Sequence, residues 1–201
     1  MIAPPERSAE RDAAIDALLP NVPFDGWTVA ALKRAAGPDA DLLFPGGAPD
    51  MIEAFCDLAD RRMEEAAERQ GLAGRLPDRV RAVIALRLEQ NRPYRESVRR
   101  ALSILALPRN AGLAARCTAR TVDAIWHAAG DRSADFSWYT KRAILASVYG
   151  TTLLYWLGDT SEDDAATLAF LDRRLAGVGR IGRTRKRIEG MFRRDRPSAA
   201  A

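Results

Sequence analysis

The residues best suited to chemistry in this chain of 201 residues are gathered between Ile125 and Trp156. His127 is the only histidine, and Asp131 follows it in a Gly-Asp turn, so these two residues are the candidates for general acid–base catalysis. A metal site draws on several histidines, cysteines or carboxylates in register, and no nucleophile with a matching base can be singled out. A histidine that is satisfied near a helix end is the simpler interpretation, and the sequence favours a protein that is not an enzyme.

Trp138 and Tyr139 are better suited to binding than to catalysis. They are adjacent at the start of an expected helix, so their side chains diverge by about 100° and at least one should be exposed. Trp, Tyr and Arg are the residues most enriched in the centres of protein interfaces, and Trp138 stands four positions before Arg142, where a cation–π contact is feasible. A core tryptophan beside a snorkelling arginine is the alternative.

Two further features look chemical but are interpreted as structural. The string GVGRIG at 177–182 matches the dinucleotide-binding fingerprint, which works only between a strand and a helix. Here it follows an expected helix near the chain end, so we interpret it as a flexible joint. Cys56 and Cys117 are isolated at no metal-like spacing, and we expect two buried, reduced thiols.

The elements that must position these residues are helical. Apolar residues recur at helical spacing throughout, and no alternating strand pattern is found, which predicts an all-α fold of about nine or ten helices. Residues 143–158 carry no charge but are fewer than the ~20 needed to cross a membrane, which predicts the central helix of the domain. Thr28 should cap the helix that Gly37 ends, and Ser161 with Asp164 should begin the next-to-last helix.

Residues 11–60 follow the rhythm of a helix-turn-helix module. A DNA reader needs cations or amides on its recognition helix and around it. Between Arg34 and Arg61 there is neither Lys nor Arg, and acidic residues occupy the stretch instead. We therefore expect no binding of nucleic acid.

The basic character of the chain belongs to its last residues. The net charge is +4, but residues 180–196 alone carry +6 and leave −2 for residues 1–179. Residues 179–201 predict a basic amphipathic helix that adsorbs to an anionic membrane, and a frayed basic tail is the alternative. The residues predicted to contact the membrane are Ile181, Arg185, Ile188, Met191 and Phe192.

The first residues show neither a secretory signal nor a membrane anchor, because no apolar run follows a basic start. We expect residues 1–10 to form a disordered leader, residues 11–178 to form one domain, and the protein to be cytoplasmic.

Two stretches resemble a known family: ALSILALPRN at 101–110 and VDAIWHAAGDRSADFSWYTKRAILASVYGTTLLYW at 122–156. They are similar to the ubiquinone-biosynthesis accessory proteins, the lipid-binding partners of the di-iron demethoxyubiquinone hydroxylase. The resemblance extends over about residues 13–177. It implies a TetR-regulator-like fold, usually dimeric, whose module no longer reads DNA and whose core encloses an apolar cavity for isoprenoid or phospholipid.

The resemblance also implies a surface patch that meets the hydroxylase. The matching positions are Asp123, Ile125, Asp135, Trp138, Tyr139 and Arg142. A C-terminal amphipathic helix contacts the membrane in such proteins, and the absence of a transit peptide suits the inner face of a bacterial plasma membrane.

We therefore expect a non-catalytic accessory protein that presents a polyprenyl quinone intermediate to the hydroxylase, with no cofactor but with a bound isoprenoid, quinone or phospholipid. The candidates for cavity walls, which could equally be ordinary core, are Leu105, Trp126, Leu145, Tyr149, Leu153 and Trp156. The alternative is a TetR-type transcription regulator that responds to a ligand, since it would share the fold and the cavity.

Overall fold

The computed structural model describes residues 3–131 and 138–177, without the side chains of Trp138 and Tyr139. Its α-helices are α1 (Ala9–Leu18), α2 (Val22–Asp25), α3 (Val29–Ala36), α4 (Ala48–Gln70), α5 (Leu76–Asn91), α6 (Arg95–Leu105), α7 (Ala111–Ala128) and α8 (Trp138–Leu157). Short 3₁₀ turns are η1 (Ala40–Leu43), η2 (Arg92–Tyr94), η3 (Pro108–Asn110) and η4 (Glu162–Asp164), and residues 165–177 are also helical. The described residues contain no strand, and the predicted all-α fold is confirmed.

Local sequence signals set several of these boundaries. The Thr28 hydroxyl accepts a hydrogen bond of 3.1 Å from the amide of Ala31 and so caps α3, which ends at Gly37 as predicted. The long helix α4 ends at Gly71, whose φ of 57° is the left-handed conformation that glycine adopts without strain.

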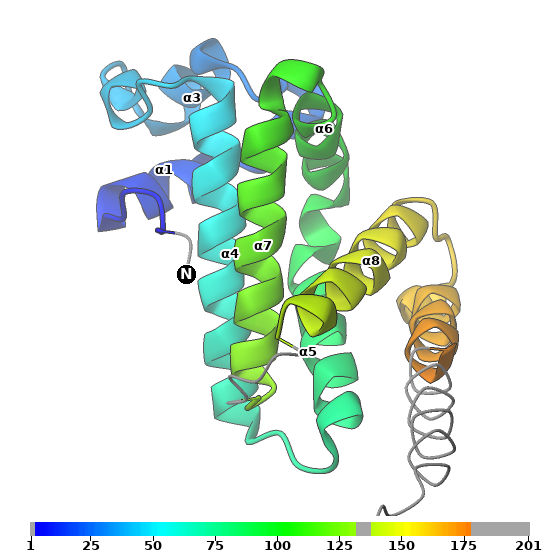
Figure 1. Cartoon of the computed structure of the whole chain (residues 1–201). Coiled ribbons are helices and arrows are strands. Elements are labelled where there is room, and N and C mark those ends of the chain that lie inside the picture. The colour runs from blue at the N-terminus through cyan, green and yellow to red at the C-terminus, as the bar shows by residue number, and fades with distance from the viewer. Residues whose placement is uncertain (1–2, 132–137, 178–201) are drawn as a thin grey trace, which may run out of the picture.

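The helices α4 and α7 lie side by side in the middle of the molecule, with α1 to α3 at one end and α5 and α6 behind them (Figure 1). The large apolar residues of α4 that face this core are Met51, Ile52, Phe55, Leu58 and Met63. Because the spacing of these residues keeps them on one stripe, α4 has one buried face along most of its length.

The prediction of a central, fully buried helix at 143–158 is wrong. The helix α8 crosses the outside of the bundle, and Leu154 is 65% exposed and Tyr155 41% exposed. The absence of charge therefore indicates a helix with apolar residues on every face. The rest of the fold covers only some of these faces. None of the described helices is both long enough and apolar enough to span a membrane.

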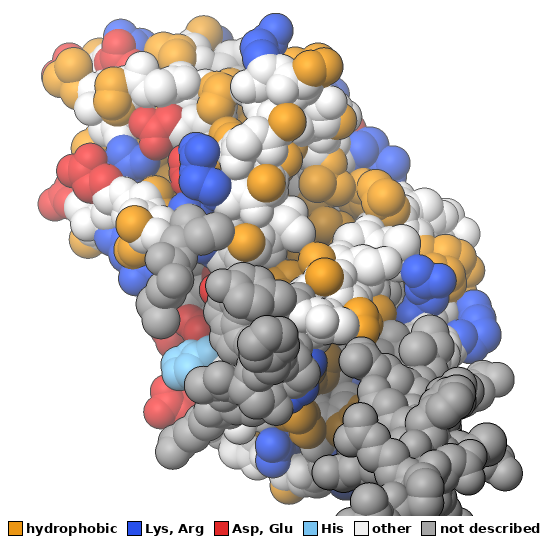
Figure 2. Space-filling view, in the orientation of Figure 1, with side chains coloured by type: hydrophobic (Ala, Val, Ile, Leu, Met, Phe, Trp, Pro, Cys, Tyr) orange, Lys and Arg blue, Asp and Glu red, His pale blue; other side chains and the backbone are white. Residues whose placement is uncertain are grey.

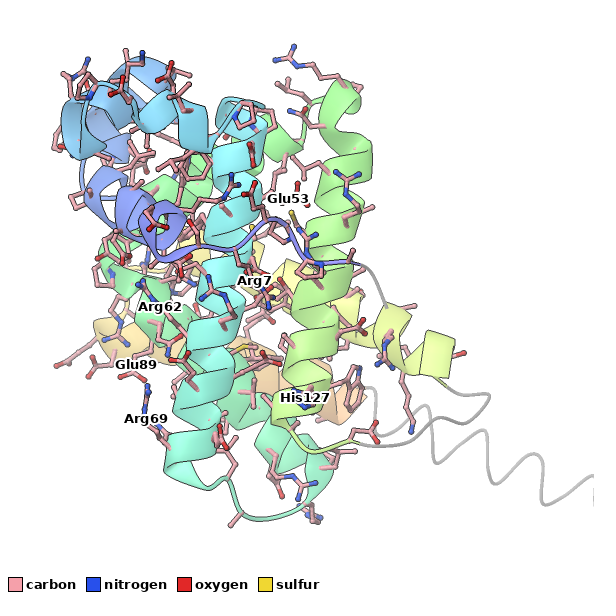
Figure 3. The ribbon with its side chains drawn as sticks, turned by 90° about the vertical axis from the view of Figure 1, so that its left-hand side faces the viewer. Arg7, Glu53, Arg62, Arg69, Glu89 and His127 are labelled. Carbon is pink, nitrogen blue, oxygen red and sulfur yellow. The ribbon has the colours of Figure 1, made fainter. Side chains whose placement is uncertain are left out.

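Residues 3–8, which the sequence assigned to a disordered leader, lie against α4 and α7. Arg7 forms a pair of hydrogen bonds with Asp57 on α4, of 2.6 and 2.9 Å, and Arg120 on α7 donates to the carbonyl of Ala3 at 3.1 Å. Figure 3 shows the segment with Arg7 crossing α4 near Glu53. These contacts join residues that are far apart in the sequence. The composition of residues 3–8 alone therefore could not predict them.

A buried ion pair joins the middle of α4 to α5. Arg87 Nη2 lies 3.0 Å from Asp60 Oδ1, and the Thr121 hydroxyl donates to the other carboxylate oxygen at 3.0 Å. Burial raises the pKa of Asp60 to about 6, although Arg87 and Thr121 act in the opposite direction. Asp60 in turn keeps the pKa of Arg87 above its usual value, against the effect of burial.

This pKa predicts a pH-dependent stability. Between about pH 4, where an unfolded Asp loses its proton, and pH 6, the folded protein holds a proton that the unfolded chain has released. The free energy of unfolding should therefore fall by roughly 3 kcal/mol from this group as pH rises through that window. Urea unfolding at a series of pH values measures it, and Asp60→Asn should flatten the decline. An equal decline in the variant would contradict the assignment to Asp60.

Candidate lipid-binding pocket

An apolar pocket lies where α8 crosses α5 and α7. It has a volume of about 190 Å³. Its walls are Leu76, Pro77, Val80, Trp126, Lys141, Ile144, Leu145, Val148 and Leu175. All of these except Lys141 are hydrophobic, so the pocket suits an apolar ligand or part of one.

Each wall comes from a different element. Ile144, Leu145 and Val148 lie on one face of α8, because residues three and four positions apart are neighbours on a helix. The first turns of α5 form the opposite wall, and Trp126 near the end of α7 forms the floor between them. Leu175 closes one side from the helical residues 165–177, which an ion pair of 2.6 Å between Asp172 and Arg81 joins to α5.

The hydrophobic side chains around α8 form part of the molecular surface. Figure 2 shows them along α8 and in the region between α8 and α6. Tyr155 on α8 stacks on Phe170 with ring centroids 4.6 Å apart, which holds the outer face of α8 to the helical residues 165–177.

Two of the six predicted cavity residues, Trp126 and Leu145, line this pocket, and the others do not. Leu105 and Tyr149 are buried in the core, and Leu153 is partly buried against it. The Trp156 side chain is fully buried, and its indole N–H donates to Asp164 at 3.1 Å. The sequence missed the walls from α5, since nothing in a helical apolar pattern says which partner helix leaves space beside it.

At the predicted start of the helix after α8, the Ser161 hydroxyl accepts a hydrogen bond of 2.9 Å from the amide of Ala166, but Asp164 is a buried acceptor for other side chains and does not complete the predicted capping box. Asp164 accepts hydrogen bonds from Trp156, Arg92 and Arg95, while the amide of Thr167 donates to Asp159 at 2.7 Å. Hydrogen bonds from Ser161 and Thr167 hold the pKa of Asp159 below its usual value, although burial opposes this. The helical residues that carry Leu175 are thus firmly anchored next to α8.

The predicted partner patch is only partly described. Arg142 on α8 donates a hydrogen bond to Asp123 on α7, so these two predicted positions meet. Ile125 is fully buried and belongs to the core, because it faces inward from α7; its assignment to the surface is corrected. Asp135 lies outside the described residues, as do the side chains of Trp138 and Tyr139, whose backbone begins α8.

His127 and Asp131 do not form an acid–base pair with each other. His127 Nδ1 lies 2.9 Å from Glu64 Oε1, and the exposed imidazole sits among acidic side chains at the end of α7 (Figures 2 and 3). Asp131 pairs with Lys141 at 3.8 Å. A satisfied histidine near a helix end is the interpretation that this geometry supports.

The helix-turn-helix-like module carries little free positive charge on α3, the helix that precedes its acidic stretch. Both cations of α3 are in ion pairs of 2.9 Å, Lys33 with Asp41 and Arg34 with Asp25. The apolar side chains of Phe24 and Leu42 are 85% and 78% exposed on the same module. Such a face suits a polyanion poorly.

Several predicted features are not described by the structure. The string GVGRIG begins at Gly177, the last described residue, and the five predicted membrane-contacting residues all lie in 178–201. Both cysteines are free thiols; Cys117 is buried as expected, whereas Cys56 is only partly buried. Within residues 3–131 and 138–177, no group of three or more possible metal ligands is present.

Fold and pocket together define a TetR-like, all-α protein with an apolar pocket beside its outer helix. The structure is similar to a TetR transcriptional regulator from Nitrosomonas europaea, with a TM-score of 0.68 and 25% identity, covering 84% of this chain and 97% of that one. The predicted TetR-like fold is thus confirmed.

Residues 111–182 match the family model of COQ9. The chain is 34% identical over 188 residues to the mitochondrial ubiquinone biosynthesis protein COQ9 of Rattus norvegicus, covering 87% of this chain and 60% of that protein. The human protein of the same name is also 34% identical over 188 residues, covering 87% of this chain and 59% of the relative. The chain is therefore a relative of COQ9, which confirms the resemblance, and it spans about 60% of the length of these relatives.

Proposed function

We propose that this protein is a non-catalytic, lipid-binding accessory protein of ubiquinone biosynthesis, which presents a polyprenyl quinone intermediate to the demethoxyubiquinone hydroxylase. The names of its relatives support the pathway. The observation that carries the proposal is the apolar pocket between α5, α7 and α8, because a protein that lifts an isoprenoid compound from a bilayer must replace its lipid surroundings. Each buried CH₂ is worth about 0.8 kcal/mol, so a polar site could not compensate an isoprenoid chain for the hydrocarbon that it leaves.

The pocket and the predicted patch for the hydroxylase share the first turns of α8. Lys141, Ile144 and Leu145 line the pocket, whereas Arg142 bonds to Asp123 on the neighbouring helix. A ligand in the pocket and a partner on the patch would therefore be close to each other. In this proposal the basic residues 179–201 adsorb to anionic lipid, and the protein works at a membrane surface as a homodimer.

Trp138→Lys should abolish co-purification of the hydroxylase. A central tryptophan in an interface commonly contributes more than 2 kcal/mol, and a buried lysine would add a desolvation cost, so we expect a loss of at least tenfold in affinity. A pull-down with purified hydroxylase measures it. The control is Leu107→Lys, since Leu107 is 37% exposed at the opposite end of α7.

The helical content and melting temperature of both variants should match those of the wild type. Retained pull-down by a folded Trp138→Lys variant would show that the docking surface lies elsewhere.

A ligand-responsive transcription regulator is the second candidate, because it would share the TetR-like fold and the pocket, although the fold alone does not favour it. Both cations of α3 are already engaged in ion pairs, which argues against DNA binding by this module. A gel-shift assay against genomic fragments separates the two functions. Sequence-specific binding at physiological salt would overturn the accessory-protein proposal.

A further inference from the structure

The indole N–H of Trp126, which packs against the core, lacks the hydrogen bond that the indoles of Trp27 and Trp156 make. The indole N–H of Trp27 donates to the carbonyl of Ser97 at 3.0 Å, and that of Trp156 donates to Asp164 at 3.1 Å. The indole nitrogen of Trp126 is shielded from solvent and has no acceptor among the described residues. A buried donor without a partner lowers the stability of a protein, so the unpaired indole N–H of Trp126 calls for an explanation.

Trp126 is also the only pocket wall with an aromatic ring, in a lining that is otherwise aliphatic except for Lys141. Lys141 already lies near a carboxylate, with its ammonium 3.8 Å from Asp131. The donor that an incoming neutral ligand could engage is therefore the indole N–H. Because the nitrogen is covered in the unliganded protein, the indole must turn or a wall side chain must shift when the ligand enters.

The size of the pocket restricts what it can hold. A volume of about 190 Å³ is close to the roughly 150 Å³ of an apolar cavity that holds one benzene molecule, and well below the 300–1,000 Å³ of sites for larger ligands. The pocket therefore fits a single substituted ring with its first substituents. A long polyprenyl chain would have to extend beyond it.

Resting on the proposed function, we infer that this pocket holds the quinone ring of the intermediate and that the Trp126 indole N–H donates a hydrogen bond to a ring oxygen. The ring then packs against aliphatic walls and the indole, while the isoprenoid tail leaves along α8. Ile144, which lines the pocket and is 37% exposed, lies at the start of that route.

The test is Trp126→Phe, which keeps an aromatic wall but removes the donor together with part of the indole ring, so that the hydrocarbon probe measures the effect of the lost apolar surface. The probes are a ubiquinone analogue with a two-isoprene tail, an isoprenoid hydrocarbon of similar length without oxygen, and a short-chain phospholipid, each titrated into delipidated protein. We expect the preference of the protein for the quinone analogue over the hydrocarbon to fall about 2- to 10-fold in the variant, which corresponds to one ordinary hydrogen bond.

Stability supplies an independent readout. If the Trp126 nitrogen has no partner in the free protein, Trp126→Phe should lower the melting temperature only through the lost packing of the smaller ring, with no added cost from a broken hydrogen bond. The matched control is Trp27→Phe, which breaks the bond to Ser97 and should lower the melting temperature. A loss of stability in Trp126→Phe as large as that in Trp27→Phe would overturn the premise.

The outcomes separate this inference from the proposed function. If the wild type binds none of the probes, the lipid-binding function itself fails. If it binds the quinone analogue and Trp126→Phe binds it equally well, the pocket stands but the hydrogen bond is refuted. A loss confined to the phospholipid would identify an ester carbonyl as the acceptor and overturn the quinone assignment.

Discussion

Replacing Asp164 by alanine should lower the free energy of unfolding by about 3–5 kcal/mol. The carboxylate is 5% exposed and accepts hydrogen bonds from Trp156, Arg92 and Arg95. Its removal leaves a buried indole N–H without an acceptor and takes one acceptor from each of two guanidinium groups, which keep their bonds to Asp163 and to the carbonyl of Asp159. Urea denaturation monitored by tryptophan fluorescence measures the change.

Asp163→Ala is the matched control. Asp163 and Asp164 both have a positive φ, of 50° and 58°, so alanine meets similar backbone strain at either position. The Asp163 side chain is 82% exposed and forms an ion pair of 2.9 Å with Arg92. We expect its loss to cost about 1–2 kcal/mol, mostly strain. Equal losses in the two variants would show that the buried hydrogen bonds of Asp164 contribute little.

Ile144→Glu should weaken binding of a ubiquinone analogue by about 100-fold. Ile144 lines the pocket yet is 37% exposed, so a glutamate there can stay hydrated while the pocket is empty. A ligand would have to strip water from the carboxylate, which costs several kcal/mol against hydrocarbon. Isothermal titration of delipidated protein with the two-isoprene analogue gives the affinities.

Leu154→Glu controls for the charge itself. Leu154 lies on the same helix and is 65% exposed, but it is not a wall of the pocket. This variant should bind the analogue as the wild type does. A similar loss of affinity in both variants would mean that the charge acts through α8 as a whole and that the pocket is misplaced.

The helical pattern of the sequence was enough to predict the class of fold and many element boundaries. Thr28 and Gly37 delimit α3 as expected, because capping is a local interaction between residues close in the chain. The burial of α8 could not be predicted, since a helix that is apolar on every face carries no signal for which face the fold covers. Hence Leu154 and Tyr155 are exposed in a stretch predicted to be central.

The candidate site was harder to predict than the fold. Trp126 and Leu145 were recognised, but Leu76, Val80 and Leu175 come from segments distant in sequence that meet only in the folded chain. Ile125 was assigned to the surface by resemblance, although its place on the inner face of α7 buries it fully. A resemblance transfers positions along the chain, whereas burial depends on how these particular helices pack.

Mass spectrometry of an organic extract of the purified protein tests the central claim most directly, with a mock purification from the same cells as the reference. We predict a near-stoichiometric isoprenoid quinone or its intermediate in the wild type and its loss in Ile144→Glu. A well-folded protein whose extract contains no lipid above the reference would contradict the claim that the pocket beside α8 carries a lipid.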